Sequence, residues 1–282
     1  MSRAFGRPIS SSVKHRSSNG RRRYAVIRRL TLPSKHVPNL MDPELVLIFW
    51  EHVMDAYADL AQIPRDRESP ERYVADVQIS AGYMHAGYPI MTHLDAAPRM
   101  ISYEKLIGKE RNVNWGLYHE MGHNHQSRLW TFAGTGEVTM NLFSMYVLET
   151  VRGLSINNQH GAISSEGRRE KIERYFAEGP DFNRWKSDPF LALIMYIQLR
   201  QAFGWQAYKR VFAEYHKLSP EKHPKTDEER RDLWMVTFSR AVGRNLGPFF
   251  EAWGVPISEE ALKSVADLPA WMPPNFPPKT KG

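Results

Sequence analysis

The 282-residue chain contains no cysteine, which excludes disulfide bonds and cysteine-ligated metal sites. It has no apolar run near 18 residues, so no segment is long enough to span a membrane as a helix. Neither absence identifies a compartment, because cysteine-free chains occur both in the cytosol and outside bacterial cells. The hydrophobic content of 42% and the eight tryptophans are typical of a folded globular protein.

Acidic residues are missing from the chain before Asp42, although the whole chain carries a net charge of +7. Ten basic residues lie in this part, so the chain from Asp42 onward has a net charge of about −3. We expect residues 1–23 to form a disordered basic tail. Aromatic side chains do not interleave with its arginines, so no nucleic-acid partner is expected. No apolar segment of a secretion signal follows the arginines.

Sequence periodicity predicts an α+β fold in which a small sheet precedes a mainly helical part. Strands are expected at 24–32 and 73–79, the second with one face formed by Tyr73, Val77 and Ile79. A helix with Asp42 as its N-cap should end at Pro64. Further helices are expected at 114–128, 136–152, 166–177, 189–203, 205–217 and 227–243. We therefore expect one domain over 24–272, helical from about 166, and a loose Pro-rich tail at 273–282.

The segment 118–125 contains two histidines four residues apart, His119 and His123. Four residues turn an α-helix by about 400°, so both imidazoles project from one face and can share one metal ion. Glu120 follows the first histidine, where it can reach a metal-bound water without taking a coordination position. This H-E-x-x-H pattern is typical of zinc metallopeptidases. His125 points about 200° round the helix from His123, which argues against it as a ligand.

A catalytic zinc needs a third protein ligand. The positions at which metzincins place a third histidine hold Gln126 and Leu129, so that class is excluded. Glu137, at the start of an expected helix, fits the third ligand of a gluzincin, and Asn141 lies one turn later, where it could accept the outer N–H of a ligating histidine. Glu149 is a rival ligand that falls about 120° round the helix from Glu137. The alternative for Glu137 is a solvated carboxylate favoured by the helix dipole.

A glycine-flanked segment, 80–90, predicts a turn or edge strand where the backbone and polar rings meet a substrate. We predict an oxyanion-stabilising donor in it, Tyr83 or His85, with rivals at Tyr88, Tyr118 and His125. The predicted substrate-binding residues are Gly82, Gly87, Tyr88 and Trp130. Trp130 and Phe132 offer flat faces that could stack on a sugar ring, and packing inside the protein is an equal alternative. A packed aromatic hairpin is likewise an equal alternative for the segment 80–90.

Four separated segments resemble the enhancin-like, mucin-degrading zinc metallopeptidases, a family whose domain is related to one in the vertebrate TRP-channel-associated factors. The segments are 82–90, 118–126, 136–138 and 249–256. The resemblance covers residues 40–272 and is specific, because several motifs occur in the correct order.

The resemblance implies a gluzincin domain with one zinc ion on His119, His123 and Glu137 and with Glu120 as general base. It implies an edge strand beside an active-site helix pair. It also implies protein or glycoprotein substrates, often mucin-type O-glycosylated ones, and a secreted or cell-surface enzyme. The competing hypothesis is a non-catalytic protein-binding module with a basic N-terminal arm. The intact Glu120 favours catalysis, because a binding module needs no carboxylate at that position.

Overall fold

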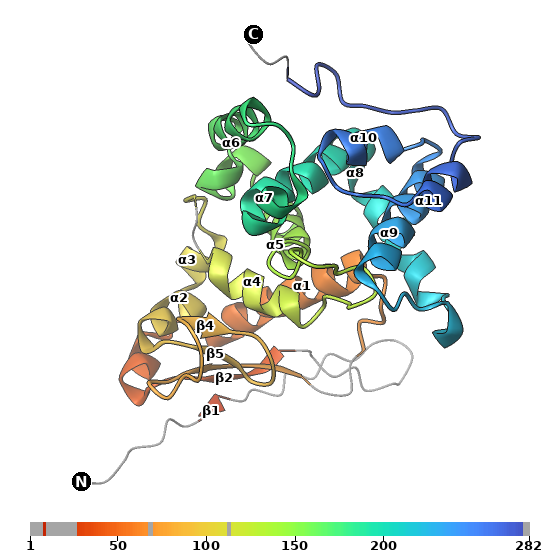
Figure 1. Cartoon of the computed structure of the whole chain (residues 1–282). Helices are drawn as coiled ribbons and strands as arrows, with labels where there is room; N and C mark the ends of the chain where they lie inside the picture. Colours follow the sequence, from red (N-terminus) through yellow and green to blue (C-terminus); the bar gives the residue numbers. More distant parts are fainter. Residues whose placement is uncertain (1–7, 10–26, 67–69, 112–113, 279–282) are drawn as a thin grey trace. The chain divides into compact units, whose positions relative to one another are not determined.

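The computed structural model describes residues 8–9, 27–66, 70–111 and 114–278 (Figure 1). These residues fall into two units. The first unit comprises the described residues up to position 59 together with 63–125 and 143–159. The second comprises 60–62, 126–142 and the described residues from 160 onward. The first unit contains the sheet, and the second is mainly helical.

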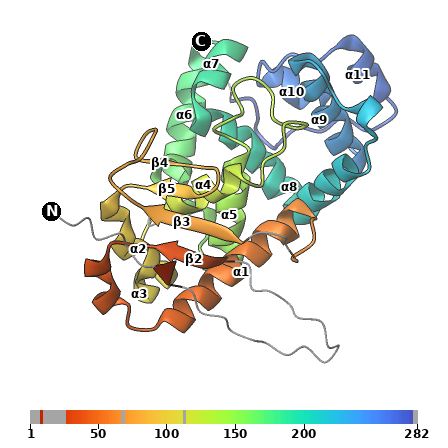
Figure 2. The same ribbon diagram turned by 90° about the horizontal axis from the view of Figure 1, so that it is seen from below.

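The sheet of the first unit has five strands in the order β1-β2-β3-β5-β4. The strands are β1 (Pro8–Ile9), β2 (Ile27–Thr31), β3 (Glu71–Ala75), β4 (Met84–His85) and β5 (Ile90–Thr92). β2, β3 and β5 are parallel, whereas β1 and β4 are antiparallel to their neighbours. Figure 2 shows β2, β3, β5 and β4 lying side by side. The mixed sheet that the sequence predicts is therefore present, and β4 is an edge strand of the described sheet.

Helix α1 (Pro43–Ala61) connects β2 to β3 and packs on the sheet. Oδ1 of Asp42 accepts a hydrogen bond from the amide of Leu45 at 2.9 Å, which confirms the predicted N-cap. The ring centroid of Trp50 lies 5.2 Å from that of Tyr73 on β3. The predicted stripe of α1 is buried and includes Val46, Trp50, Val53, Tyr57 and Leu60. These are the residues that the helical period places on one face.

The segment between the sheet and position 160 contains four further α-helices among the described residues. They are α2 (Ala97–Ile101), α3 (Tyr103–Ile107), α4 (Trp115–His123) and α5 (Met140–Thr150). The indole Nε1 of Trp50 donates to the carbonyl of Met100 at 3.0 Å and so ties α1 to α2. Short 3-10 helices lie at Ser34–Asn39, Leu94–Ala96, Ile156–Asn158, Gly161–Ile163 and Pro220–Lys222. α2 and α3 were not predicted, because helices of five residues have too few turns to show a period.

The second unit is built on two helices that pack through aromatic side chains. Its helices are α6 (Ser165–Ala177), α7 (Phe182–Ser187), α8 (Pro189–His216), α9 (Asp227–Val242), α10 (Gly247–Ala252) and α11 (Glu259–Ser264). The ring centroids of Tyr208 on α8 and Phe238 on α9 lie 5.0 Å apart. α8 has a break at Gly204, whose φ is 70°. This is the boundary predicted between helices 189–203 and 205–217, and a left-handed φ is most readily adopted by glycine.

Three predicted elements are shorter in the structure. The strand predicted to reach residue 79 ends at Ala75, because the Asp76 carboxylate accepts from the Gln78 amide and turns the chain. Val77, predicted to lie on a strand face, is 65% exposed. The helix predicted at 114–128 ends at His123, and the one predicted at 136–152 begins only at Met140. Single-sequence patterns locate element ends less reliably than element types.

The predicted terminal tails are only partly covered by the described residues. Pro8–Ile9, inside the predicted disordered tail, pairs with β2, and the rest of residues 1–23 lies outside the described part. In the tail predicted to be loose, the ring of Phe276 lies 5.2 Å from Trp253 and 5.1 Å from Phe176. The described start of that tail is therefore packed. No helix among the described residues is both long and apolar enough to cross a membrane.

Candidate metal centre

Helix α4 separates a buried face from a half-buried face that carries the motif. Its buried side chains include Trp115, Tyr118 and Met121, whereas His119, Glu120 and His123 are half-buried. Helical geometry alone produces this separation, since residues four apart recur on one side. The predicted projection of both histidines from one face is confirmed.

The two histidine side chains converge on one point. Their Nε2 atoms lie 3.2 Å apart and their rings are inclined at 82°. Ligand atoms of His119, Glu120 and His123 all lie within 4.8 Å of one another. Two nitrogens bound to one tetrahedral zinc at ordinary Zn–N distances are about 3.3 Å apart. The residues present therefore fit a zinc ion.

Two buried tyrosines donate hydrogen bonds to backbone carbonyls of α4. The hydroxyl of Tyr57 on α1 donates to the carbonyl of Tyr118, and that of Tyr73 on β3 donates to the carbonyl of Leu117, each at 2.6 Å. Both tyrosines are fully buried, and burial raises the pKa of each well above its ordinary value. They therefore remain protonated donors. Tyr118, a rival for the oxyanion role, is itself completely buried.

His125 is part of the core of the first unit. It is 7% exposed, and its Nδ1–H donates to the carbonyl of Met121 at 2.9 Å. Its ring centroid lies 4.7 Å from that of Tyr57 and 5.8 Å from that of Phe143. The prediction that His125 is not a metal ligand is supported by this inward packing.

Asn124, directly after the second histidine, connects α4 to the glycine-flanked segment. Its Oδ1 accepts from the Gly87 amide at 3.0 Å, and its Nδ2 donates to the Gly87 carbonyl at 3.1 Å. Nδ2 also donates to Oε2 of Glu71 at 3.1 Å. Gly87 was predicted to bind a substrate; Asn124 bonds both of its backbone polar groups, and its contact with a substrate stays a prediction.

The hydroxyl of Tyr83 is engaged by two charged side chains. It donates to Oδ1 of Asp95 and accepts from Arg99, both at 2.6 Å. Partial desolvation and the bond to Asp95 raise the pKa of Tyr83, while the same bond lowers the pKa of Asp95. The single proton of this hydroxyl is already donated. The prediction that Tyr83 is a free oxyanion donor is therefore not supported.

His85 on β4 also has partners at both ring nitrogens. Nδ1–H donates to the carbonyl of Ala86 at 2.9 Å, and Nε2 lies 3.0 Å from Oγ of Ser80. With the proton on Nδ1, neutral His85 keeps Nε2 as an acceptor for the serine hydroxyl. A donor role for His85 would require one of these bonds to break, so this prediction is not supported either.

The edge strand β4 runs close to α4. A Cβ added to Gly116 on α4 would lie 3.1 Å from Sδ of Met84 on β4, so glycine permits this approach. Gly82 has a φ of +59°, which glycine adopts at little cost. Tyr88 is 60% exposed. Gly82 and Tyr88 are therefore accessible, and their substrate contacts stay a prediction.

Glu137 lies in a turn that precedes α5, in the second unit. The amide of Val138 donates to the carbonyl of Thr135 at 3.0 Å, which closes the turn, and Glu137 is exposed. Nδ2 of Asn141 donates to the backbone carbonyl of Glu137 at 3.1 Å. Glu137 is thus one turn from Asn141, as predicted, but before the helix. Its role as third ligand, and that of Asn141 behind a histidine, stay predictions.

Trp130 does not offer a face to a sugar, and that prediction is wrong. It is 2% exposed, and its ring centroid lies 4.6 Å from Phe212 and 5.4 Å from Tyr215. Phe132 is also buried and stacks 6.1 Å from Trp185. Both rings belong to the aromatic core of the second unit, which was the structural alternative.

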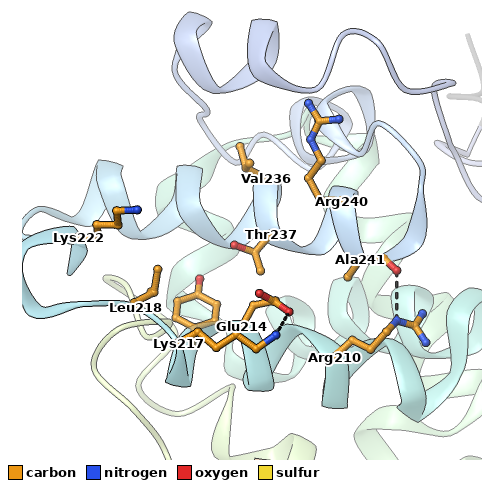
Figure 3. A pocket seen from close by; sticks show the side chains of 10 residues that line it. Arg210, Glu214, Lys217, Leu218, Lys222, Val236, Thr237, Arg240 and Ala241 are labelled. Carbon is orange, nitrogen blue, oxygen red and sulfur yellow. Dashed lines mark hydrogen bonds and ion pairs between the residues drawn. The ribbon is translucent and has the colours of Figure 1, made fainter.

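A pocket of about 580 Å³ lies in the second unit beside α8 and α9 (Figure 3). Its lining includes Arg210, Lys217, Lys222 and Arg240, and two of these cations are paired, Lys217 with Glu214 and Arg240 with Asp267. None of the predicted site residues lines it. This pocket is therefore not the predicted chemical site.

The chain is similar to several known proteins. TRPM8 channel-associated factor 2 of Homo sapiens is 45% identical over 243 residues, which are 86% of this chain and 26% of that protein. The chain thus spans about a quarter of that relative's length. A crystal structure of a conserved protein of unknown function from Bacillus anthracis is 27% identical, with a TM-score of 0.74, over 86% of this chain and 50% of the other.

A more distant solved structure, a metallopeptidase in complex with Tn antigen, shares the fold. It is 17% identical, with a TM-score of 0.67, over 88% of this chain and 50% of the other. The model of the family described as peptidase M60, enhancin and enhancin-like, matches residues 27–254. This match includes strands β2 to β5, α4 with its His-Glu-His cluster and the turn that carries Glu137. The chain therefore belongs to the enhancin and enhancin-like peptidase M60 family.

Proposed function

We propose that the protein is a zinc-dependent endopeptidase that hydrolyses peptide bonds in glycosylated proteins. The observation that carries this proposal is the convergence of His119, Glu120 and His123 on α4, with the two Nε2 atoms 3.2 Å apart. Membership of a peptidase family supports it. Two imidazoles and a carboxylate at this spacing are the side chains that zinc hydrolysis requires.

Each motif residue has a distinct role in the proposed reaction. His119 and His123 would hold the metal through Nε2. Bound zinc supplies Lewis-acid chemistry, which lowers the pKa of water and polarises a carbonyl. Glu120 accepts the proton of the attacking water and passes it to the leaving amine, so that no charged amide anion has to leave.

Glu137 is the proposed third ligand. The proposal rests on its position after the motif and on its one-turn spacing from Asn141, whose Nδ2 bonds the Glu137 carbonyl. Glu137→Ala should weaken zinc binding in a chelator competition titration. The matched control is Glu170→Ala, an exposed glutamate of α6 with no role in the proposal. Equal zinc affinities in the two variants would remove Glu137 from the site.

The general-base assignment is tested with Glu120→Gln, which keeps the size of the side chain and removes its basicity. We expect zinc to be retained and proteolysis to fall by at least about 100-fold, the usual contribution of a positioned general base. Glu170→Gln is the control and should keep full activity. If Glu120→Gln retains both zinc and wild-type activity, the mechanism is wrong.

The proposed substrate is an extended peptide that pairs with the edge strand β4. Exposed strand edges bind peptides by main-chain hydrogen bonds, and β4 lies against the motif helix. An O-glycosylated substrate is proposed because a metallopeptidase of the same fold has been solved in complex with Tn antigen. With Trp130 buried, sugar contacts would have to come from accessible residues such as Tyr88.

The glycan preference is tested by digesting one mucin before and after enzymatic deglycosylation. Mass spectrometry of the fragments should place the cleavage sites next to glycosylated Ser or Thr, and deglycosylation should slow cleavage. Equal cleavage of both forms would contradict the glycan preference and indicate a general endopeptidase.

A second candidate function is a protein-binding module. It is favoured by the 45% identity to a protein named as a channel-associated factor. In that case partner binding would survive Glu120→Gln. Replacing Arg21, Arg22 and Arg23 by glutamine leaves the sequence of β1 and β2 unchanged and separates the hypotheses further. Loss of partner binding with the zinc site intact would then favour a binding role for the basic arm.

A further inference from the structure

The side chain of Asn124 behaves as a substitute for a neighbouring peptide strand. Its amide forms two hydrogen bonds with one peptide residue, accepting from Gly87 N–H at 3.0 Å and donating to Gly87 C=O at 3.1 Å. This pair of bonds is the one that a residue of an adjacent antiparallel strand would make. A third bond, from Nδ2 to Oε2 of Glu71 at 3.1 Å, uses the remaining amide hydrogen.

These three bonds join segments that are far apart in the sequence. Asn124 directly follows His123, Gly87 lies two residues after the edge strand β4, and Glu71 begins β3. Gly87 has a φ of +114°, a conformation open to glycine, so its backbone can turn both polar groups toward Asn124. One side chain therefore links the metal-binding end of α4 to two strands of the sheet.

We propose that Asn124 is a positioning residue that fixes His123 relative to the strand edge on which the substrate lies, an inference that rests on the proposed function. Asn124 also occupies the backbone N–H of Gly87, so a peptide that pairs with β4 cannot bond to that donor. The position of His123 and the register of the substrate thus both depend on the side-chain amide of Asn124.

Asn124→Asp tests the proposal with almost no change of shape. The substitution keeps an acceptor for the Gly87 amide but removes the donor to the Gly87 carbonyl. It also places the new carboxylate next to the Glu71 carboxylate, so that two acceptors face each other. Asn124 is exposed, so the change opens no cavity and the protein should fold. Asn183→Asp, at an exposed position of α7, is the matched control.

We expect Asn124→Asp to lower kcat/KM by about 10- to 100-fold, through a lower kcat and a higher KM. Small displacements at a reacting centre have effects of this size. Zinc affinity should fall by about tenfold, as when support of a metal ligand is lost. Hydrogen exchange in the peptide 82–90 should become faster. Adding Glu71→Gln to Asn124→Asp places an amide donor opposite the carboxyl group and should restore part of each loss.

Unchanged zinc affinity and unchanged exchange in Asn124→Asp would overturn the proposal, as would a loss of stability with kcat and KM equal to those of Asn183→Asp. Zinc affinity and exchange do not depend on peptidase activity. If the wild-type chain cleaves no substrate, the proposed function fails, and these two measurements still decide the role of Asn124.

Discussion

The two tyrosine hydroxyls that bond to α4 are predicted to stabilise the folded protein, and this stabilisation can be measured. Tyr57 and Tyr73 donate to the carbonyls of Tyr118 and Leu117, each at 2.6 Å. Tyr57→Phe and Tyr73→Phe delete only the hydroxyls. The ring contacts of Tyr57 with His125 and Phe143, at 4.7 and 5.6 Å, are available to phenylalanine as well.

The expected loss follows from what remains after the deletion. A buried intramolecular hydrogen bond contributes about 1 kcal/mol net to stability. The accepting carbonyls lie inside α4, where helical N–H groups also reach them, so neither becomes an unsatisfied acceptor. Each variant should therefore lose about 1 kcal/mol in free energy of unfolding, and the double variant should lose more than either single variant.

Urea unfolding of the metal-free protein measures these losses as shifts of the midpoint at constant slope. Tyr88→Phe, at a 60% exposed position, is the control and should change the free energy by less than about 0.5 kcal/mol. A double variant as stable as the wild type would refute the stabilising role of the hydroxyls. A single loss above about 3 kcal/mol would show that ring packing, and not the hydrogen bond, had been disturbed.

Three further predictions concern stability. Gly134→Ala should destabilise the protein far more than Gly153→Ala in thermal unfolding. Both glycines have a left-handed φ, but only at Gly134 would the added Cβ meet another side chain, Lys186, at 2.1 Å. Trp130→Ala should cost about 3–5 kcal/mol in denaturant titration, with an unchanged ratio of cleavage rates for glycosylated and bare substrate. Asp188 is partly desolvated, but its bonds to Lys171 and to the first amides of α8 lower its pKa. Its contribution to stability is therefore present above its unfolded pKa of about 3.9 and is lost as pH falls through the folded value. Asp188→Asn should flatten that part of the profile of stability against pH.

The sequence predicted the features that depend on local geometry. His119 and His123 lie on one helix face because residues four apart recur there whatever surrounds the helix. Asp42 caps α1 because its carboxylate reaches an amide three residues on. The break at Gly204 likewise follows from the backbone freedom of one residue. Such features need only neighbours in the chain.

The tertiary structure decided which side chains meet across long stretches of sequence. Asn124 forms hydrogen bonds with Gly87, which lies 37 residues away in the sequence. The hydroxyl of Tyr83 forms hydrogen bonds with Asp95 and Arg99. Trp130 is buried because Phe212 and Tyr215 on α8 cover its ring. A residue type tells whether a side chain can bind a ligand or pack in a core. Which of the two it does depends on non-local contacts, because burial is a property of the folded surface and not of the local sequence.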